Sequence, residues 1–549
     1  MLRAFVATAW VAFFVATAFY RLHAADLPYS LDGDQAQAVG HYWRYAVPGA
    51  IPTGHLISDY AFAYHSPPGW WAIMASLSAL LGPLVAAKAM GVVALLAMAI
   101  AGGLLVGRRT EWLLGALVAF LIVRDGPEDP QQIVGGVARS MAPALLYLFA
   151  LAFHERRHRT ALVILVAQAA IYPSLAIPCG IAYGSFCVVM GPMRDRLRRC
   201  AGMLVAGALV IVLGLAQDLS SPSWWGPTVT YAEAAQMPAW GPGGRFNEVP
   251  HMPLPQLLTQ QLERGYVRLG HTPLPRDLVK RISAHAVLLL VALPLAAGLA
   301  LLAMSAADAR ARRRRQQGPA EEVVCAAASS APWSIAWLCA ASLVGYALVR
   351  VVSFKLFLPA RQIGFTAPYL ALVGTPWLLW YAARAAFPTR PGAALVVAVG
   401  LGVLPAFILR GDGLAVTSAG YSPHKDEGPL WQAIRALPLD DEVACDLHTC
   451  EVMMLLGQHV PFASRNLAHP LRKGYYAEVE RRLIESQRVL HATSATEIEQ
   501  FVAREHVHWF AYEIDNASTL DKRLFHPLDD EVKVLFDAGA DQPRLLADP

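Results

Sequence analysis

The acidic cluster Leu31-Asp32-Gly33-Asp34-Gln35 stands directly after the first apolar run of the chain and opens a long polar segment. Carboxylates at the edge of a membrane are costly and mark functional sites. We therefore expect chemistry on a lipid-linked substrate here, with Asp34 as the general base. The neighbouring Asp32, or burial among lipid headgroups, would raise the pKa of one of these two carboxyls toward the working range. A turn that caps the following helix is the alternative, because Asp and Gly are favoured at such positions.

A second acidic group, Asp125-Gly126-Pro127-Glu128-Asp129, closes a hairpin between two further apolar runs. The carboxylates of Asp125, Glu128 and Asp129 can position an acceptor or bind a hard cation such as Mg²⁺ or Mn²⁺, although no complete ligand set is visible. The flanking Arg139 can neutralise this group or reach a phosphate. A solvated Pro-Gly turn is the alternative. A divalent cation therefore stays open, and no cofactor is assigned.

Basic residues that suit a phosphate stand at Lys355 and Arg361, in the segment 354–362. Two cations at a membrane boundary can hold a phosphate or pyrophosphate, with Arg as a fork and Lys as a point charge. Lys and Arg are usually in excess on the cytoplasmic side of a membrane, so cations on the outer side indicate a functional role. Snorkelling toward lipid headgroups is the alternative.

The composition indicates that the elements which carry these residues lie in a membrane. Of the 549 residues, 56% are hydrophobic and only 16% are charged, and the apolar residues form runs long enough to cross a bilayer. We predict a polytopic α-helical membrane protein with about eleven transmembrane helices. The predicted spans are 5–20, 84–106, 112–123, 141–153, 161–174, 175–190, 203–215, 285–304, 333–352, 363–382 and 393–409.

Arginine clusters between the apolar runs fix the expected orientation, because all of them fall on one side of the predicted spans. They are Arg3 and the segments 108–109, 156–159, 194–199, 310–315 and 384–390. By the positive-inside rule this side is the cytoplasm. The N-terminus is then cytoplasmic, as part of an uncleaved signal-anchor, and the protein lies in the bacterial inner membrane. The outer segments are the loops 23–69, 125–132 and 217–284 and the C-terminal tail. Scattered basic clusters argue against nucleic acid as a partner and favour contact with membrane lipids.

The polar tail, 411–549, predicts a small periplasmic α/β domain after a transmembrane domain over 1–410. It holds no nucleophile triad, phosphate loop or dinucleotide-binding fingerprint, so we expect an accessory domain that binds the acceptor or covers the site. Cys445 and Cys450 can form a disulfide in an oxidising compartment. The histidines lack metal-ligand spacing, so no zinc site is assigned. The expected helices are 427–437, 451–456, 475–486 and 496–505, and the expected strands are 442–445 and 509–512.

In the order of its parts, the chain resembles the GT-C superfamily of membrane glycosyltransferases. These parts are one span, a long acidic outer loop, many further spans and an outer domain. Asp34-Gln35 stands where protein O-mannosyltransferases and aminoarabinose transferases carry Asp-Glu, and Asp32 would compensate for the missing second acid. The segment 64–71, which includes His65, is similar to the family's proline-rich stretch before a surface helix. Lys88 stands where many relatives carry a basic residue at the start of the second span.

The resemblance implies transfer of a sugar, with inversion, from a polyprenyl-phosphate donor to a lipid, glycan or protein acceptor. Such a transfer needs a base for the acceptor hydroxyl and cations for the departing phosphate. Two other classes stay open. A transporter or flippase would also have many spans and charges, and an O-antigen ligase or polymerase would use Arg and His of the loop 217–284. The residues expected in the transferase site are Asp34 and Asp32 as catalytic groups, Asp125, Glu128 and Asp129 for the acceptor or a metal, Lys355, Arg361 and Lys88 for the donor phosphate, and His65 and Arg139 in substrate loops.

Overall fold

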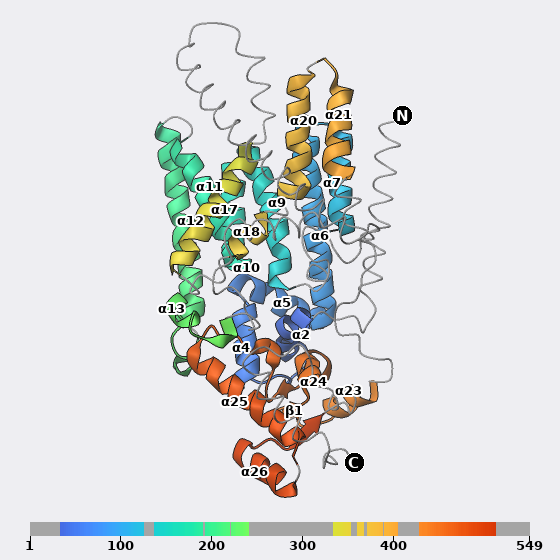
Figure 1. The fold of residues 1–549 in the computed structure, drawn as a ribbon, viewed down its shortest axis with the longest axis vertical. Coiled ribbons are helices and arrows are strands. Elements are labelled where there is room, and N and C mark those ends of the chain that lie inside the picture. Colours follow the sequence, from blue (N-terminus) through green and yellow to red (C-terminus); the bar gives the residue numbers. More distant parts are fainter. Residues whose placement is uncertain are drawn as a thin grey trace.

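The computed structural model describes ten stretches of the chain, and it is mostly helical. They are residues 33–125, 137–189, 193–219, 221–240, 333–352, 360–366, 370–387, 389–404, 428–492 and 494–511. Figure 1 shows two parts, a bundle of long helices and, at one end of it, a smaller domain that holds the last part of the chain. The predicted spans 5–20 and 285–304 lie outside the described residues.

Most helices of the bundle overlap predicted apolar runs, but α5 corresponds to none of the predicted spans and α12 begins ten residues before the predicted run 203–215. They are α5 (Pro68–Leu81), α6 (Pro83–Gly107), α7 (Trp112–Asp125), α9 (Met141–His154), α10 (His158–Ile171), α11 (Pro173–Val189), α12 (Met193–Leu219), α17 (Trp333–Val352), α18 (Arg361–Gly364), α20 (Thr375–Ala386) and α21 (Pro391–Ala398). Among the described residues, α6 and α17 are the two helices that are both long and apolar enough to cross a membrane. The predicted number of about eleven spans is therefore not established by the fold.

One predicted span, 363–382, is described only in part, because residues 367–369 lie outside the described stretches. Its described parts are the short α18, the π-helical turn η6 (Leu370–Gly374) and α20. The turn η6 runs directly into α20. Pro376 occupies the first turn of α20, where the missing N–H of proline is tolerated.

The arginine-rich turns gather at the end of the bundle that lies away from the small domain. Figure 1 places the α6–α7, α9–α10 and α20–α21 turns and the start of α12 at this end. Two of the turns are joined by an ion pair, because Glu155 of the α9–α10 turn accepts from Arg108 at 2.6 Å. Within its own turn Glu155 also accepts from Arg157 at 2.7 Å. The bundle therefore has one basic end and one end covered by the domain.

The small domain is built on a three-stranded sheet in the order β2-β1-β3, with both pairings parallel. This agrees with the predicted α/β character of the tail, although β2 was not among the expected strands. The elements are β1 (Glu442–Cys445), β2 (Val460–Pro461), β3 (Trp509–Ala511), α23 (Gly428–Arg435), α24 (Leu447–Val452), η9 (Met453–Gly457), η10 (Arg465–Leu467), α25 (Lys473–Leu490) and α26 (Ala495–Glu505).

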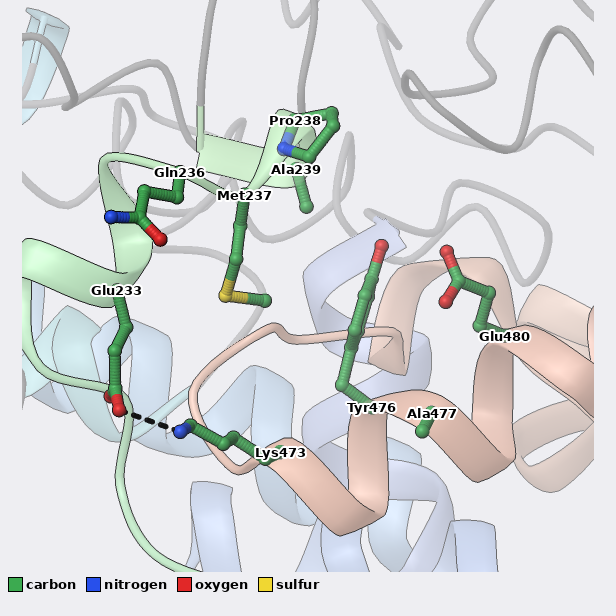
Figure 2. Close-up of a pocket in the computed structure, with 9 residues that line it drawn as sticks. All are labelled: Glu233, Gln236, Met237, Pro238, Ala239, Lys473, Tyr476, Ala477 and Glu480. Carbon is green, nitrogen blue, oxygen red and sulfur yellow. Dashed lines mark hydrogen bonds and ion pairs between the residues drawn. The ribbon is translucent and has the colours of Figure 1, made fainter.

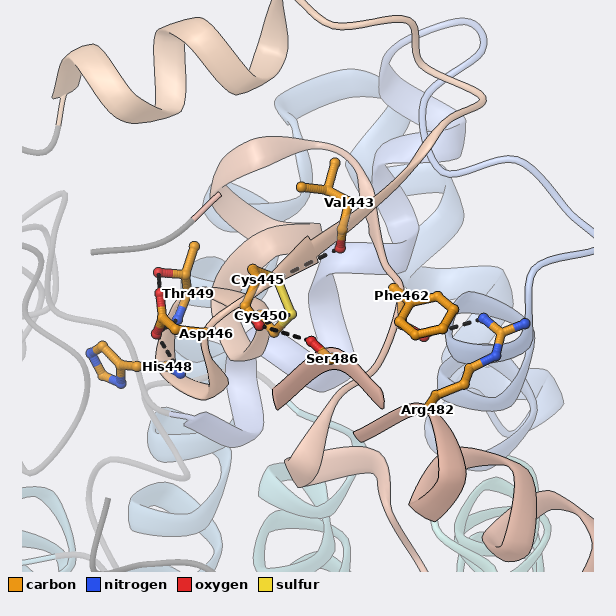
Figure 3. The surroundings of a disulfide bond; sticks show 9 residues. All are labelled: Val443, Cys445, Asp446, His448, Thr449, Cys450, Phe462, Arg482 and Ser486. Carbon is orange, nitrogen blue, oxygen red and sulfur yellow. Dashed lines mark hydrogen bonds between the residues drawn. A yellow bond between two sulfur atoms is a disulfide. The ribbon is translucent and has the colours of Figure 1, made fainter. Parts of the chain in front are cut away.

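A disulfide joins Cys445 at the end of β1 to Cys450 in α24, with the two Cα atoms 5.3 Å apart (Figure 3). Between them Asp446 caps α24, since its carboxylate accepts from the backbone N–H groups of His448 and Thr449. Ser486 of α25 donates to the Cys445 carbonyl. The start of α24 is thus held to β1 and α25 by covalent and polar contacts.

The core of the small domain takes residues from three distant parts of the chain. Ile57 and Tyr60 come from α4 (Leu56–His65), Trp225 from the segment after α12, and Phe462 and Tyr475 from the domain itself. The segment 51–65, part of the predicted first outer loop, and the domain therefore share one hydrophobic core and form one packed unit.

Candidate functional site

Asp34 lies in the first turn of a helical run made of α2 (Gly33–Val39), η1 (Gly40–Tyr42) and α3 (Trp43–Ala46). Its side chain is outside what the structure describes. The helix α2 packs against α6 of the bundle, against α4, and against α24, η9 and η10 of the small domain. Asp34 is thus carried by the element at which the bundle, the first outer loop and the domain meet (Figure 1).

Gly40 allows the close approach of this run to the domain. A Cβ on Gly40 would lie 2.6 Å from Met454 Cβ and 2.8 Å from the Leu455 backbone nitrogen. Both distances are too short for a real contact, so any larger residue would push η1 and η9 apart. Nearby, the Trp43 indole N–H donates to the Leu455 carbonyl at 2.8 Å. These contacts fix the helix that carries Asp34 against the domain.

Polar side chains follow the helical run at three- and four-residue spacing, which places them along one face of a helix. After Asp34 come Gln37, His41 and Arg44, and both Gln37 and His41 are buried. His41 Nε2 and the Tyr42 hydroxyl each lie 2.8 Å from Ser66 Oγ, so the three side chains form a hydrogen-bonded network. Burial lowers the pKa of His41 well below its usual value, with smaller contributions from the charges of Arg44 and His65. His41 is therefore neutral near pH 7.

Arg44 is the cation of this cluster. Its side chain is only 13% exposed, and among the described residues an Asp59 carboxylate oxygen lies 4.0 Å from its Nη2. Its guanidinium carbon stands 5.3 Å from the Phe62 ring centroid. Burial lowers the pKa of Arg44, although the Asp59 charge opposes this shift. A guanidinium with so distant a carboxylate suits the binding of an oxyanion, for which its fork geometry is adapted.

His65 ends α4 and lies where the first outer loop contacts the domain. Its ring centroid is 4.8 Å from that of Tyr64 and 6.2 Å from that of the buried His469. One turn earlier, Tyr60 stacks on Tyr475 of α25 with a centroid distance of 3.5 Å. Stacked rings of this kind add to the burial energy of the interface. His65 thus joins the His41 and Arg44 cluster to the domain.

The other predicted site residues fall in several places. Lys88 lies in the second turn of α6, which packs against α2. Arg139 lies in η2 (Ala138–Ser140), before α9. Arg361 begins α18, which packs against α11 and α17. Asp125 ends α7, and its side chain is outside the described residues, as are Asp32, Glu128, Asp129 and Lys355 as a whole.

The structure therefore brings the helices of Asp34 and Lys88 together and adds His65 to the same region. Arg361 lies on α18, which packs against α17 and α11. His41 and Arg44, which contact the loop at Ser66 and Asp59, were missed from the sequence. The signal that could have found them is the recurrence of polar residues at positions 34, 37, 41 and 44, because this spacing marks one face of a helix.

Within the stretches that the structure describes, no group of three or more His, Cys, Asp or Glu side chains is placed to hold a metal ion. The acidic segment 125–129, for which the binding of a divalent cation stayed an open possibility, is not described beyond Asp125. No protein-family model matches the chain, and no curated protein matches its sequence.

A second polar contact between the first loop and the domain depends on pH. His55 Nδ1 lies 3.0 Å from Glu442 Oε1 on β1, and the other Glu442 oxygen accepts from Arg482 at 2.9 Å. Figure 3 shows Arg482 beside Phe462, whose ring it covers at 4.8 Å. The hydrogen bond with Glu442 raises the pKa of His55, and the nearby charge of Asp59 adds to this shift.

We expect this pair to stabilise the fold in mildly acid solution. A raised pKa in the folded state contributes stability that is complete below the unfolded value, about 6.5, and is lost as the pH rises through the folded value. Between pH 6 and pH 8.5 the wild type should therefore lose more stability than His55→Gln, by up to about 1 kcal/mol for a partly exposed pair. Thermal unfolding in detergent at both pH values would measure this. Parallel pH profiles of the two proteins would contradict the assignment.

Proposed function

We propose that the chain is a membrane glycosyltransferase that moves a sugar from a polyprenyl-phosphate-linked donor to a lipid, glycan or protein acceptor, with Asp34 as the general base. One observation carries the proposal. The helix with Asp34 is clamped between the bundle and the domain, and the same helical run continues into the buried guanidinium of Arg44. A carboxylate and a cation on one element are the two groups that this reaction needs.

In the proposed reaction, the Asp34 carboxylate takes the proton of an acceptor hydroxyl. The hydroxyl oxygen bonds to the anomeric carbon of the donor, and the bond between this carbon and the phosphate oxygen breaks, with inversion. The lipid phosphate leaves with the bonding electrons, and Arg44 stabilises its charge. Neutral His41 hydrogen-bonds to Ser66, which also hydrogen-bonds to the Tyr42 hydroxyl, and this network stabilises the helical run that carries Arg44. Lys88 is the cation on the adjoining membrane helix.

We also propose that the protein has about eleven spans in the bacterial inner membrane, with its N-terminus in the cytoplasm and the small domain in the periplasm. The separation of the arginine-rich turns from the domain supports this orientation, because basic turns favour the cytoplasm (Figure 1). The bonded pair Cys445 and Cys450 supports it as well, since disulfides persist in oxidising compartments.

Two measurements would test this orientation. Reporter fusions after Gly411 should give a periplasmic signal, and fusions near Arg310 a cytoplasmic one. In membranes unfolded by a denaturant, Cys445 and Cys450 should resist a maleimide until a reductant is added, whereas in a Cys450→Ser variant Cys445 should be labelled without a reductant. A cytoplasmic signal from both fusions would remove the orientation and, with it, the proposed transferase. The corresponding assay of function is transfer from a radiolabelled polyprenyl-phosphate sugar into membrane acceptors.

A further inference from the structure

Arg44 of α3 and Asp59 of α4 carry opposite charges, but they do not form a hydrogen-bonded pair. The Asp59 Oδ1 atom lies 4.0 Å from Arg44 Nη2, which is beyond the length of a hydrogen bond. A closed pair is visible elsewhere in the molecule, where Lys473 Nζ lies 2.6 Å from Glu233 Oε1 (Figure 2). Asp59 is therefore close enough to act on Arg44 through its charge, and too far away to occupy the N–H groups of Arg44.

The position of Asp59 is fixed by its own helix. Asp59 lies in the first turn of α4, where the helix dipole favours a negative charge. Its Oδ2 atom accepts from the backbone N–H of Gly54 at 2.9 Å. Gly54 has a φ of +96°, a conformation that favours glycine, so the turn before α4 is adapted to present this N–H. These contacts hold the carboxylate to the N-terminal end of α4 rather than to Arg44.

The guanidinium of Arg44 keeps hydrogen-bond donors for a ligand. Its Nε and Nη2 atoms are buried, and within the described part of the chain neither has a hydrogen-bond partner. The N–H groups of these two atoms point to the same side of the planar guanidinium, which is the geometry that binds two oxygens of one phosphate. An oxyanion bound there would lie within roughly 7 Å of the Asp59 carboxylate, because an N–H···O hydrogen bond is about 2.9 Å long.

The donor and the product of the proposed reaction differ in charge. A polyprenyl-phosphate sugar is a phosphodiester with a single negative charge, whereas the lipid phosphate that leaves is a monoester with a charge of about −1.5 to −2 at pH 7. Arg44 attracts both. The distance to Asp59 is shorter than the screening length of about 8 Å in physiological salt, so Asp59 repels both ligands and repels the product more strongly.

We propose that Asp59 is a specificity-determining residue, which shifts the preference of the Arg44 site from the doubly charged lipid phosphate toward the singly charged donor. The inference rests on the proposed role of Arg44 in holding the donor phosphate. Asp59 takes no part in the reaction itself. It lowers the affinity for each ligand in proportion to the charge of the ligand, and it thereby helps the lipid phosphate to leave after transfer.

Asp59→Asn tests the inference, because asparagine keeps the size of the side chain and an oxygen for the Gly54 N–H but removes the charge. The probes are farnesyl phosphate and its methyl diester, which share one apolar tail and differ by about one charge at pH 8. Calorimetric titration of the purified full chain in a neutral detergent would measure both affinities. Asp59→Asn should bind both probes more tightly than the wild type does, and the gain should be about threefold to tenfold larger for the monoester.

The ratio of the two affinities is the readout, because a merely structural change at Asp59 would alter both affinities alike. The shift in this ratio should shrink in 1 M salt, where the screening length falls to about 3 Å. Glu111→Gln is the matched control, since it removes a carboxylate from the α6–α7 turn at the opposite, arginine-rich end of the bundle, and its ratio should equal that of the wild type. Asp59→Ser, which also keeps an oxygen without the charge, is the second variant if Asp59→Asn folds poorly.

An unchanged ratio in the Asp59 variants, weaker binding of both probes by them, or binding of neither probe to the wild type would each overturn the inference. Arg44→Ala should bind both probes weakly, and binding like that of the wild type would remove the phosphate from Arg44 and the inference with it. A wild type that shows the expected ratio but transfers no sugar would remove the proposed transferase and leave the charge selection in place, so the two failures are distinguishable.

Discussion

Asp34→Asn should abolish sugar transfer while leaving the fold and donor binding largely intact. Asparagine keeps the shape of the side chain but cannot accept the proton of the acceptor hydroxyl. Loss of a positioned general base slows a reaction by roughly 10²–10⁴-fold. The measurement is transfer from a radiolabelled polyprenyl-phosphate sugar into membrane acceptors, with thermal unfolding in detergent as the check on folding.

Asp32→Asn is the matched control for this experiment, because it removes a carboxylate two residues away and should have a milder effect. Near-normal transfer by Asp34→Asn together with an inactive Asp32→Asn would move the base to Asp32. Normal transfer by both variants would return the acidic cluster to the role of a helix cap, which is the alternative that the composition of the cluster allows.

Arg44→Ala should raise the concentration of donor needed for half-maximal transfer by about 10- to 100-fold, because hydrogen bonds to a charged phosphate contribute about 1.5–3 kcal/mol each. Arg44→Lys should fall between the wild type and Arg44→Ala, since it keeps the charge and loses the fork. Donor titration in membranes, at a saturating acceptor concentration, would measure this series.

Arg361→Ala provides the comparison, because Arg361 was predicted from the sequence to hold the same phosphate. Its helix α18 packs against α11 and α17, so we expect a smaller effect on donor use than in Arg44→Ala. The opposite order of the two alanine variants would move the phosphate to α18. A donor dependence unchanged in Arg44→Ala would leave Arg44 with a structural role beside Asp59 and Phe62.

The regular parts of the fold could be predicted because they depend on local patterns. The apolar run 84–106 was expected and corresponds to α6 (Pro83–Gly107), and the run 141–153 corresponds to α9 (Met141–His154). The run 363–382 was expected as one helix, and its described parts are α18, η6 and α20. The strand β2 was missed, since two residues, Val460 and Pro461, give no period to recognise.

The site could be predicted from the sequence only where its residues stand close together along the chain. The acidic cluster at Asp34 was visible, whereas the approach of Gly40 to Met454 and the pairing of His55 with Glu442 join positions about 400 residues apart. A single sequence gives no information on such long-range contacts. Arg44 was overlooked for a different reason, because a lone arginine in a polar loop resembles any solvated surface cation until its burial is known.

The shared core of the first loop and the domain also sets the order of events during synthesis. Trp43 and its acceptor carbonyl on Leu455 are 412 residues apart, so at 5–20 residues per second the loop waits roughly 20–80 s for its partner. During this time Ile57 and Tyr60 have no domain to cover them. Exposed apolar side chains of this kind are prone to aggregate, so we expect a chaperone to cover this segment until the domain is made. Substitutions in this loop should therefore reduce the amount of assembled protein before they affect its chemistry.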